Sequence, residues 1–390
     1  MAVAYIVDAV RTAGGRRGGR LAGTHAVDLG AATLDAIADR NDFDPRAIED
    51  VITGCVTQGG EQSGDVGRNC VLASRLPDSI PSVSIDRQCG SSQQSIHFAA
   101  QGVMSGMQDM VLAHGVESMT RAPMGSTFKL FKDADLGTSK SPRLEEAYPG
   151  IQFSQFMGAE MIVKKYGFHR DDLDAFALES HKKAIAAVES GAFDKEIVGV
   201  SIETPEGEEL HKVDEGIRFD ATMESIGSVK LLQEGGAITA ANASQICDGS
   251  SAVLVCSEQA LKDHGLTPRA RIVNLTVTAG DPVIMLEEPL FATDRALQRA
   301  GMNMGDIDLY EVNEAFAPVP LAWLKHTGAD RSKINVNGGA IALGHPLGAS
   351  GTKLMATLLN AMENQGSKYG LQTMCEGGGQ ANVTIIERLN

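Results

Sequence analysis

The 390-residue sequence has few cysteines and no long apolar run. Its six cysteines are scattered, and no two of them have the C-x-x-C spacing of a zinc or redox motif, so neither a disulfide framework nor a metal site is expected. No stretch of about 18 apolar residues could span a membrane, and the N-terminus lacks the basic and apolar regions of a signal peptide. We therefore expect a cytoplasmic protein with reduced thiols.

Positive charge is also scarce. The 34 Lys and Arg residues face 50 Asp and Glu residues, so the formal net charge is -16. Such an acidic field repels nucleic acid and anionic lipid, and neither is expected as a partner. An anionic ligand would need a local basic site or a set of backbone N–H groups. The chain is long enough for two to three domains at roughly 150 residues each.

Short β-branched runs alternate with helical patterns along most of the chain. Residues 82–85 and 308–312 are typical of strands, whereas 94–105, 171–188 and 351–363 have helical periodicity. This alternation predicts an α/β fold. It is lost from about residue 119 to 240, and we interpret that segment as an inserted domain.

A weak internal repeat relates the two flanks of this insertion. Residues 48–55, an acidic turn that leads into a β-branched strand, resemble residues 306–312. Residues 83–86, which lead to Cys89, are similar to 334–337, which lead to His345. Two copies of one α/β unit with an insertion between them would explain the length of the chain.

Cys89 lies between a predicted strand and a predicted helix. The N–H groups at the start of a helix favour a thiolate and would depress the pKa of this thiol from about 8.5, which is the environment of a nucleophile. A small buried apolar side chain at a helix start is an equally good interpretation of one isolated cysteine.

His345 occurs in an apolar, glycine-rich loop ahead of another predicted helix. In such surroundings an imidazole stays neutral and can accept the proton of a thiol, as a general base does. Cys89 and His345 together would form an activated nucleophile. The histidines at 97, 181 and 326 fall within helical patterns and are expected to be structural or superficial.

Two further polar residues follow predicted strands. Cys375 precedes three glycines, Gly377 to Gly379, whose N–H groups can converge on an oxyanion, although a tight turn with an incidental cysteine is the simpler interpretation. Asn313 has the spacing of a helix N-cap, and its amide could also hold a water molecule or a carbonyl oxygen.

These four segments together resemble the thiolase family. The resemblance covers essentially the whole chain, in family order, through the segments AVRT (9–12), RQCGSSQQ (87–94), GVESMT (115–120), MGAE (157–160), TAANAS (239–244), DG (248–249), NEAF (313–316), GHP (344–346) and CEGGG (375–379). It implies two similar βαβαβαββ halves packed together with a loop domain. The implied divisions are an N-terminal half at 1–118 completed by about 241–265, a CoA-binding loop domain at 119–240 and a C-terminal half at 266–390.

The resemblance also implies a role for each candidate residue. Cys89 would be the nucleophile that is acylated, His345 the base that activates it, and Cys375 the acid and base at the α-carbon. Asn313, through a water molecule, and His345 would form one oxyanion site, and the N–H groups of Cys89 and Gly377 would form the other. The family assembles as dimers or tetramers, so we expect a homodimer or a homotetramer.

Coenzyme A is the implied co-substrate, with no permanently bound cofactor and no metal. By resemblance, Arg218 would meet the nucleotide end of CoA and Ser244 the pantetheine. Arg218 could equally form a surface ion pair worth about 0–1 kcal/mol. The Gly-Arg loop at 14–20 lacks the order of a P-loop and is interpreted as a surface turn.

The expected activity is that of an acyl-CoA C-acetyltransferase, which cleaves 3-ketoacyl-CoA with CoA through an acyl-Cys89 intermediate, in a degradative pathway such as fatty acid β-oxidation. Phe156 stands where acetoacetyl-type biosynthetic thiolases tend to carry histidine, which favours a bulkier acyl chain. The segment around Cys89 is similar to that of degradative bacterial members, including steroid side-chain thiolases. The alternatives are a biosynthetic acetoacetyl-CoA thiolase, a ketoacyl synthase, which the CEGGG segment argues against, and a non-catalytic CoA-binding protein.

Overall fold

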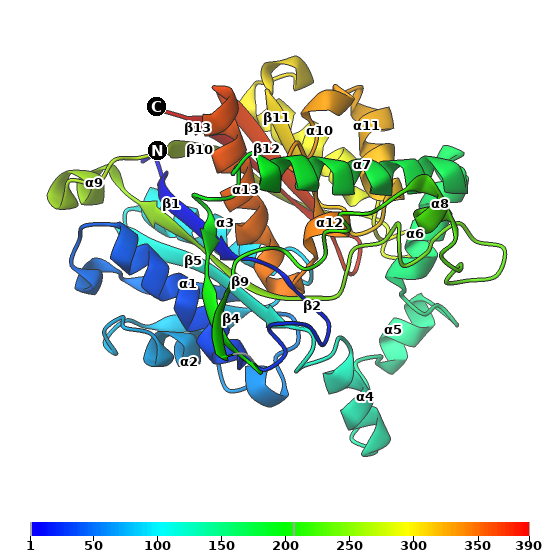
Figure 1. The fold of residues 1–390 in the computed structure, drawn as a ribbon, viewed down its shortest axis with the longest axis horizontal. Helices are drawn as coiled ribbons and strands as arrows, with labels where there is room; N and C mark the ends of the chain where they lie inside the picture. Colours follow the sequence, from blue (N-terminus) through cyan, green and yellow to red (C-terminus); the bar gives the residue numbers. More distant parts are fainter. Residues whose placement is uncertain (1, 206, 390) are drawn as a thin grey trace.

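The computed structural model describes residues 2–205 and 207–389, and most strands belong to one mixed sheet. Figure 1 shows helices on the outer sides of this sheet and further helices between its two halves. Its order is β11-β12-β13-β10-β1-β9-β5-β3-β4, with β2 beside β9 and β6 beside β1, and β7 and β8 form a separate hairpin. The bounds are β1 (Tyr5–Thr12), β2 (Gly15–Arg16), β3 (Asp50–Gly54), β4 (Ser82–Ile85), β5 (Met110–Ser118), β6 (Ile197–Val198), β7 (Val200–Thr204), β8 (Gly207–His211), β9 (Cys247–Cys256), β10 (Ala270–Ala279), β11 (Leu309–Val312), β12 (Tyr369–Glu376) and β13 (Gln380–Arg388).

The sheet consists of two similar halves. In the first half, β4, β3 and β5 are parallel to one another, β9 is antiparallel to β5, and β1 is antiparallel to β9. In the second half, β11 and β12 are parallel to each other, β13 is antiparallel to β12, and β10 is antiparallel to β13. Beside β11, at the position that β4 takes beside β3, Ile334 forms a single parallel bridge to Tyr310. The predicted α/β fold with two similar halves is confirmed.

The helices form layers around the two halves. Their bounds are α1 (Ala26–Arg40), α2 (Val66–Ala73), α3 (Ser91–Ser105), α4 (Ser126–Asp133), α5 (Pro142–Ala147), α6 (Gln155–Tyr166), α7 (Arg170–Glu189), α8 (Met223–Gly227), α9 (Glu258–His264), α10 (Glu288–Ala300), α11 (Pro318–Thr327), α12 (Ala340–Leu343) and α13 (Ser350–Gln365). The helical periodicity predicted for 94–105, 171–188 and 351–363 falls within α3, α7 and α13.

Helices α3 and α13 form the central layer. Ile96 of α3 and Leu359 of α13 belong to one buried cluster, together with Val111 and Ala113 of β5. The intervening Leu112 packs in another cluster, with α1 on the outer side of the sheet. This alternation is the two-residue period of a strand that is covered on both faces. The first turns of α3 and α13 lie at the edge where the parallel strands end, which is where α/β folds place their chemistry.

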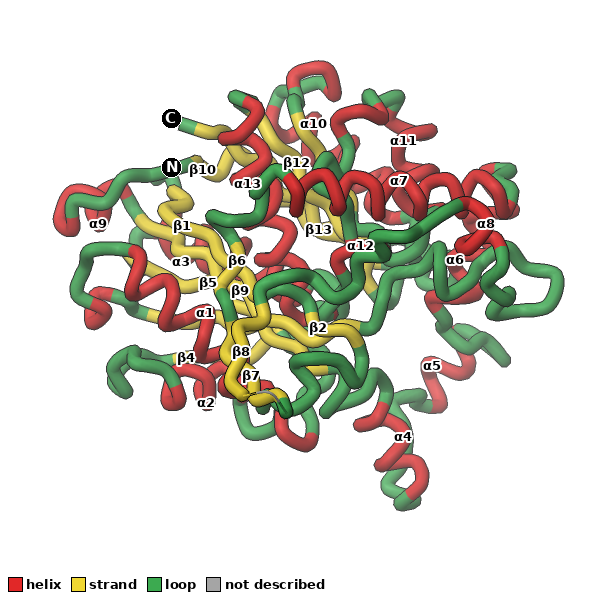
Figure 2. The backbone as a smooth tube through the Cα atoms, viewed as in Figure 1, coloured by secondary structure: helices red, strands yellow, loops and turns green. Residues whose placement is uncertain are grey.

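The segment between β5 and β9 contains the least regular part of the fold. Figure 1 shows α4 and α5 projecting from the layered body, and Figure 2 shows them joined by long loops. The segment also returns to the main sheet, because β6 pairs in parallel with β1. The division at residues 119 and 240 stays a prediction. Within residues 2–205 and 207–389, no helix combines the length and apolar character needed to cross a bilayer.

Candidate active site

Cys89 lies in a tight turn at the entrance to α3. Gln88, the residue before it, adopts a left-handed conformation with φ of 50°, and its N–H donates to Asp86 Oδ1 at 2.6 Å. The turn places the thiol two residues ahead of the helix, in a buried cluster that also contains Leu347 and Met374. The first and second halves of the molecule therefore both contribute to its surroundings.

The Cys89 thiol is not activated in the way the sequence predicts. Burial raises the pKa of this thiol to about 12, a value that includes the smaller effect of the charge that Glu376 carries when it is ionised. The predicted depression of the pKa by the helix is wrong in this structure, because the side chain is only 8% exposed and a thiolate there loses its hydration. A thiolate has to form by transfer of the proton to a neighbouring base.

His345 has the hydrogen bonds of such a base. Its Nδ1 lies 2.5 Å from Ser350 Oγ, and the Ser350 hydroxyl donates to the Pro346 carbonyl at 2.8 Å. Because a serine has only one O–H, Ser350 must accept from the imidazole, and Nδ1 must carry the proton. The lone pair of the ring is then on Nε2, which lies 3.3 Å from Asn313 Nδ2.

The loop that carries His345 is tied to α13 by a buried lysine. Lys353 Nζ donates to the carbonyl groups of Leu343 at 2.6 Å and Gly344 at 3.2 Å. Burial, and to a smaller extent the nearby Lys353 cation, lowers the pKa of His345 to about 3. The imidazole is therefore neutral at neutral pH, as a general base must be.

Asn313 connects strand β11 to His345. The predicted N-cap role is wrong, since helix α11 begins at Pro318 with Ala317 before it. The chain from 313 to 317 is instead held by the bridge between Phe316 and Ala243, so the helix starts later. The buried Asn313 Oδ1 has no hydrogen-bond partner among the described residues, which leaves it able to accept from a water molecule.

Cys375 and the glycine turn belong to the hairpin between β12 and β13. Gly378 and Gly379 have φ of 81° and 74°, which side chains with a Cβ rarely adopt. A Cβ at Gly377 would lie 2.8 Å from Gln88 Oε1, so this turn packs against the segment that holds Cys89. Burial raises the pKa of Cys375 well above its usual value, and the charge of a Cys89 thiolate would raise it further. Cys375 is therefore a protonated thiol close to the nucleophile.

A narrow cavity of about 80 Å³ leads to His345. Ser244 and Gln245 line one part of it, and the aromatic pair Phe156 and Phe316 lines another. The two rings meet edge to face at 5.4 Å between centroids. Gln245 also lines a second cavity of about 340 Å³, so the two cavities are neighbours.

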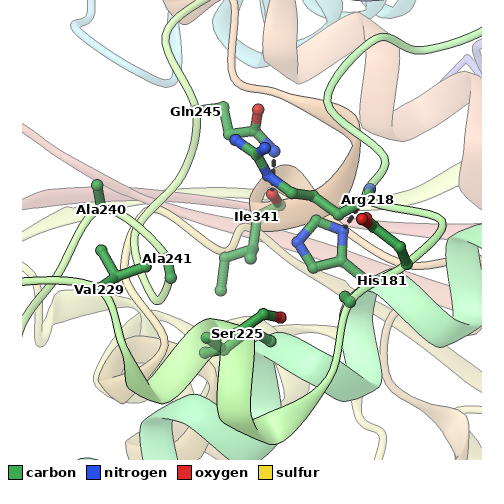
Figure 3. Close-up of a pocket in the computed structure, with 11 residues that line it drawn as sticks. His181, Arg218, Ser225, Val229, Ala240, Ala241, Gln245 and Ile341 are labelled. Atoms are coloured by element: carbon green, nitrogen blue, oxygen red, sulfur yellow. Dashed lines mark hydrogen bonds between the residues drawn. The ribbon is translucent and has the colours of Figure 1, made fainter.

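Arg218 lies in this larger cavity. Figure 3 shows its side chain extending toward the Gln245 amide, while its backbone N–H donates to His181 Nδ1 at 3.2 Å. Arg218 is exposed, and no carboxylate in the described part of the chain pairs with its guanidinium. Asp220 lines the same cavity, so its charge is mixed.

The structure thus brings Cys89, His345, Asn313, Cys375 and Gly377 toward one edge of the central layer and places Ser244 and Arg218 along two neighbouring cavities. Sequence reasoning missed Ser350, Gln245 and Glu376 as members of the site. The spacing of Ser350 from His345 was visible, but its hydrogen bond depends on the turn between them. Across residues 2–205 and 207–389 there is no group of three His, Cys, Asp or Glu side chains that could hold a metal ion.

Comparison with known families identifies the class of protein. Residues 4–259 match the family model described as thiolase, N-terminal domain, and residues 266–388 match thiolase, C-terminal domain. The chain belongs to the thiolase family and is an acyltransferase. The predicted family and enzyme class are confirmed.

Individual relatives match this chain over its full length or nearly so. A steroid 3-ketoacyl-CoA thiolase of Mycobacterium tuberculosis is 50% identical over 100% of this chain and 95% of its own length. An acetyl-CoA acetyltransferase of Escherichia coli is 40% identical over 99% of both chains. The crystal structure of human mitochondrial 3-ketoacyl-CoA thiolase has a TM-score of 0.89 at 35% identity, covering 100% of this chain and 99% of that one.

Proposed function

We propose that this thiolase cleaves 3-ketoacyl-CoA with CoA, giving acetyl-CoA and an acyl-CoA shortened by two carbons. The observation that supports this most directly is the hydrogen bonding of His345. Its Nδ1 lies against the Ser350 hydroxyl group, and its Nε2 accepts from the amide of Asn313 at 3.3 Å, which leaves the basic nitrogen on the side of Asn313. A neutral base, a buried thiol and a second protonated thiol are the groups that thiolytic cleavage requires.

In the first half-reaction, the Cys89 thiol gives its proton to His345 Nε2, and the sulfur attacks the 3-keto carbon. The oxyanion that forms is bound by the backbone N–H groups of Cys89 and Gly377, since the N–H of the nucleophile's own residue lies next to the carbonyl joined to its sulfur. The bond between C2 and C3 then breaks. Cys375 donates its proton to C2, and the acyl group stays on Cys89.

The enolate of acetyl-CoA also needs hydrogen-bond donors on its thioester oxygen. Protonated His345 provides one through Nε2–H, and a water molecule held by Asn313 provides the other. In the second half-reaction the CoA thiol loses its proton to the Cys375 thiolate and attacks the acyl-Cys89 carbonyl. Cys89 leaves and recovers its proton from His345, so the protons balance over one cycle.

The two neighbouring cavities suggest the path of CoA. We place its phosphates near Arg218, where a cation without an ion-pair partner offers charge-assisted hydrogen bonds in an otherwise acidic protein. The pantetheine would then pass Ser244 and Gln245 toward His345. CoA acts here as a co-substrate, and the segment 119–240 would serve as the CoA-binding loop domain between the halves 1–118, with 241–265, and 266–390.

The acyl group is proposed to be bulky. Phe156 and Phe316 form an apolar wall of the cavity, and Phe156 is 42% exposed, so its ring offers free surface to a ligand. The similarity to a steroid 3-ketoacyl-CoA thiolase favours a ring-bearing acyl chain. The second candidate is acetoacetyl-CoA, favoured by the similarity to the acetyl-CoA acetyltransferase of Escherichia coli. A cytoplasmic homodimer or homotetramer remains the proposed assembly.

A substrate panel tests this proposal. Acetoacetyl-CoA, a medium-chain 3-ketoacyl-CoA and a ring-bearing 3-ketoacyl-CoA are offered with CoA, and kcat/KM is measured for each. We expect the ring-bearing substrate to be cleaved fastest, and Phe156→His to shift the preference toward acetoacetyl-CoA. Selective turnover of acetoacetyl-CoA by the wild-type enzyme would overturn the acyl-chain assignment. Condensation that depends on malonyl-CoA, without thiolysis, would overturn the proposed reaction.

A further inference from the structure

Glu376 carries a fully buried carboxyl group. It is the last residue of β12, directly after Cys375, and it has no exposed surface. Neither of its carboxyl oxygens makes a hydrogen bond within the described part of the chain. Buried carboxyl groups are usually hydrogen-bonded or ion-paired, so this exception calls for an explanation.

The carboxyl group packs against Gly90, the residue that precedes α3. A Cβ atom at Gly90 would collide with Glu376 Oε1, which shows that the carboxyl packs on the residue next to Cys89. Both thiols feel its charge, because an ionised Glu376 raises the pKa of Cys89 and of Cys375. Glu376 is therefore close to both groups that must carry negative charge during the reaction.

The surroundings of Glu376 only partly compensate a negative charge. Arg87, ahead of α3, is the cation that faces it, but Arg87 Nη1 donates to Gln380 Oε1 at 2.9 Å and Arg87 Nε is buried without a partner. The backbone N–H of Asn382 on β13 also favours the ionised form. Burial outweighs both and raises the pKa of Glu376 well above its usual value.

We propose that Glu376 is a positioning residue that keeps an uncharged carboxyl group close to both thiols, and that loss of its proton suppresses their chemistry. The proposal rests on the roles of Cys89 and Cys375 given above. When Glu376 loses a proton to solvent, its carboxylate repels the thiolate that Cys89 forms on giving a proton to His345. The same charge opposes the thiolate that Cys375 leaves behind when it protonates C2.

The rate of alkylation of Cys89 by iodoacetamide, followed by peptide mapping between pH 7 and 10, tests this proposal. Glu376→Gln and Glu376→Met are uncharged at every pH, and two variants are used in case one does not fold. We expect each to react at about the wild-type rate at pH 7 and about five- to tenfold faster at pH 10, because a nearby charge opposes thiolate formation only in the wild type. Glu376→Asp should restore a wild-type profile.

Glu311→Gln is the matched control. Glu311 on β11 is also buried, has an oxygen without a partner among the described residues and has a raised pKa, but its charged neighbours are Glu314, Glu196, Lys183 and Arg11, not the thiols. This variant should follow the wild-type profile. A rate ratio for Glu376→Gln or Glu376→Met that does not change with pH would overturn the proposal. Because alkylation needs no acyl-CoA, this result is independent of the substrate panel.

Discussion

The two halves of the molecule place different chemistry at corresponding points of the same architecture. In the first half, the turn before α3 carries Cys89, and in the second, the loop before α13 carries His345. The two helices pack together in the central layer, so their first turns face one site. A repeated unit thus supplies two anchors, one for a nucleophile and one for its base.

A second comparison shows what distinguishes a base from a structural histidine. His114 in the first half and His345 in the second are both buried, and burial lowers the pKa of each to about 3. The two nitrogens of His114 are held by the hydroxyl groups of Thr53 at 3.0 Å and Ser250 at 3.1 Å. His345 has a hydroxyl group on Nδ1, whereas its Nε2 accepts a longer hydrogen bond, at 3.3 Å, from the amide of Asn313. The partners of the ring nitrogens, and not the pKa, distinguish the catalytic candidate.

The largest effect on turnover is expected from replacing Cys89, in the first half of the molecule. Cys89→Ala removes the nucleophile and should lower turnover by at least about 10⁴-fold. Intact mass after incubation with acetyl-CoA should show no acetyl group. Cys256→Ala, at a buried cysteine on β9, should still be acetylated, and an acetyl adduct on the Cys89→Ala protein would contradict the assignment.

Removing the thiol of the second half should separate two steps. Cys375→Ala should still form acyl-Cys89 but lower cleavage and condensation by about 10²- to 10⁴-fold, since no group then exchanges the proton at the α-carbon. Acyl-enzyme is measured by mass and cleavage by release of acetyl-CoA. Near-normal turnover would mean that another group carries this proton.

The proposed CoA site lies away from Cys89 and His345, so a change there should weaken CoA binding and leave the chemical steps at these two residues intact. Arg218→Gln should raise the KM for CoA about tenfold through loss of a charge-assisted hydrogen bond, with kcat little changed. Steady-state kinetics with varied CoA measures this. An unchanged KM would place the phosphates elsewhere.

The tautomer of His345 should matter less than the base itself. Ser350→Ala removes the acceptor of the Nδ1 proton and should lower kcat about tenfold, because the imidazole can then turn or carry its proton on Nε2. Ser350→Thr keeps the hydroxyl and should recover most of the activity. Equal kcat for the wild type and Ser350→Ala would remove Ser350 from the site.

The structural histidine should affect stability rather than rate. The pKa of His114 is lower in the folded than in the unfolded chain, so below about pH 6.5 only the unfolded chain takes up this proton, and stability falls as the pH falls. Between pH 6.5 and 4.5 the wild type should lose about 2–3 kcal/mol more of its free energy of unfolding than His114→Gln. Urea unfolding at the two pH values measures it, and equal losses would contradict the prediction.

Local sequence patterns correctly predicted helices at 94–105, 171–188 and 351–363 and strands at 82–85 and 308–312, because periodicity and β-branched runs report directly on burial. The two halves were predicted from the weak internal repeat and from the resemblance to the thiolase family. The error at Asn313 has a tertiary cause. A polar residue after a strand and before a proline-containing helix has the pattern of an N-cap, but the bridge between Phe316 and Ala243 delays the helix and turns Asn313 toward His345.

The pKa of Cys89 was predicted in the wrong direction for a similar reason. A helix after Cys89 was predicted correctly, although it begins at Ser91 and not at residue 94, yet a helix terminus contributes only part of the field around a thiol. The carboxyl group of Glu376 and the burial of the thiol come from segments far apart in the chain. Desolvation depends on everything packed around the sulfur, which no local pattern contains.

The sequence by itself determined the family, the α/β halves and the residues able to do the chemistry, because these depend on residue type, order and spacing. Only the tertiary structure decided how they act: that Ser350 fixes the proton on His345 Nδ1, that Arg218 and Ser244 line two cavities joined at Gln245, and that a buried carboxyl group packs against Gly90, next to Cys89. Hydrogen-bond direction and desolvation depend on groups that approach one another only when the two halves pack together.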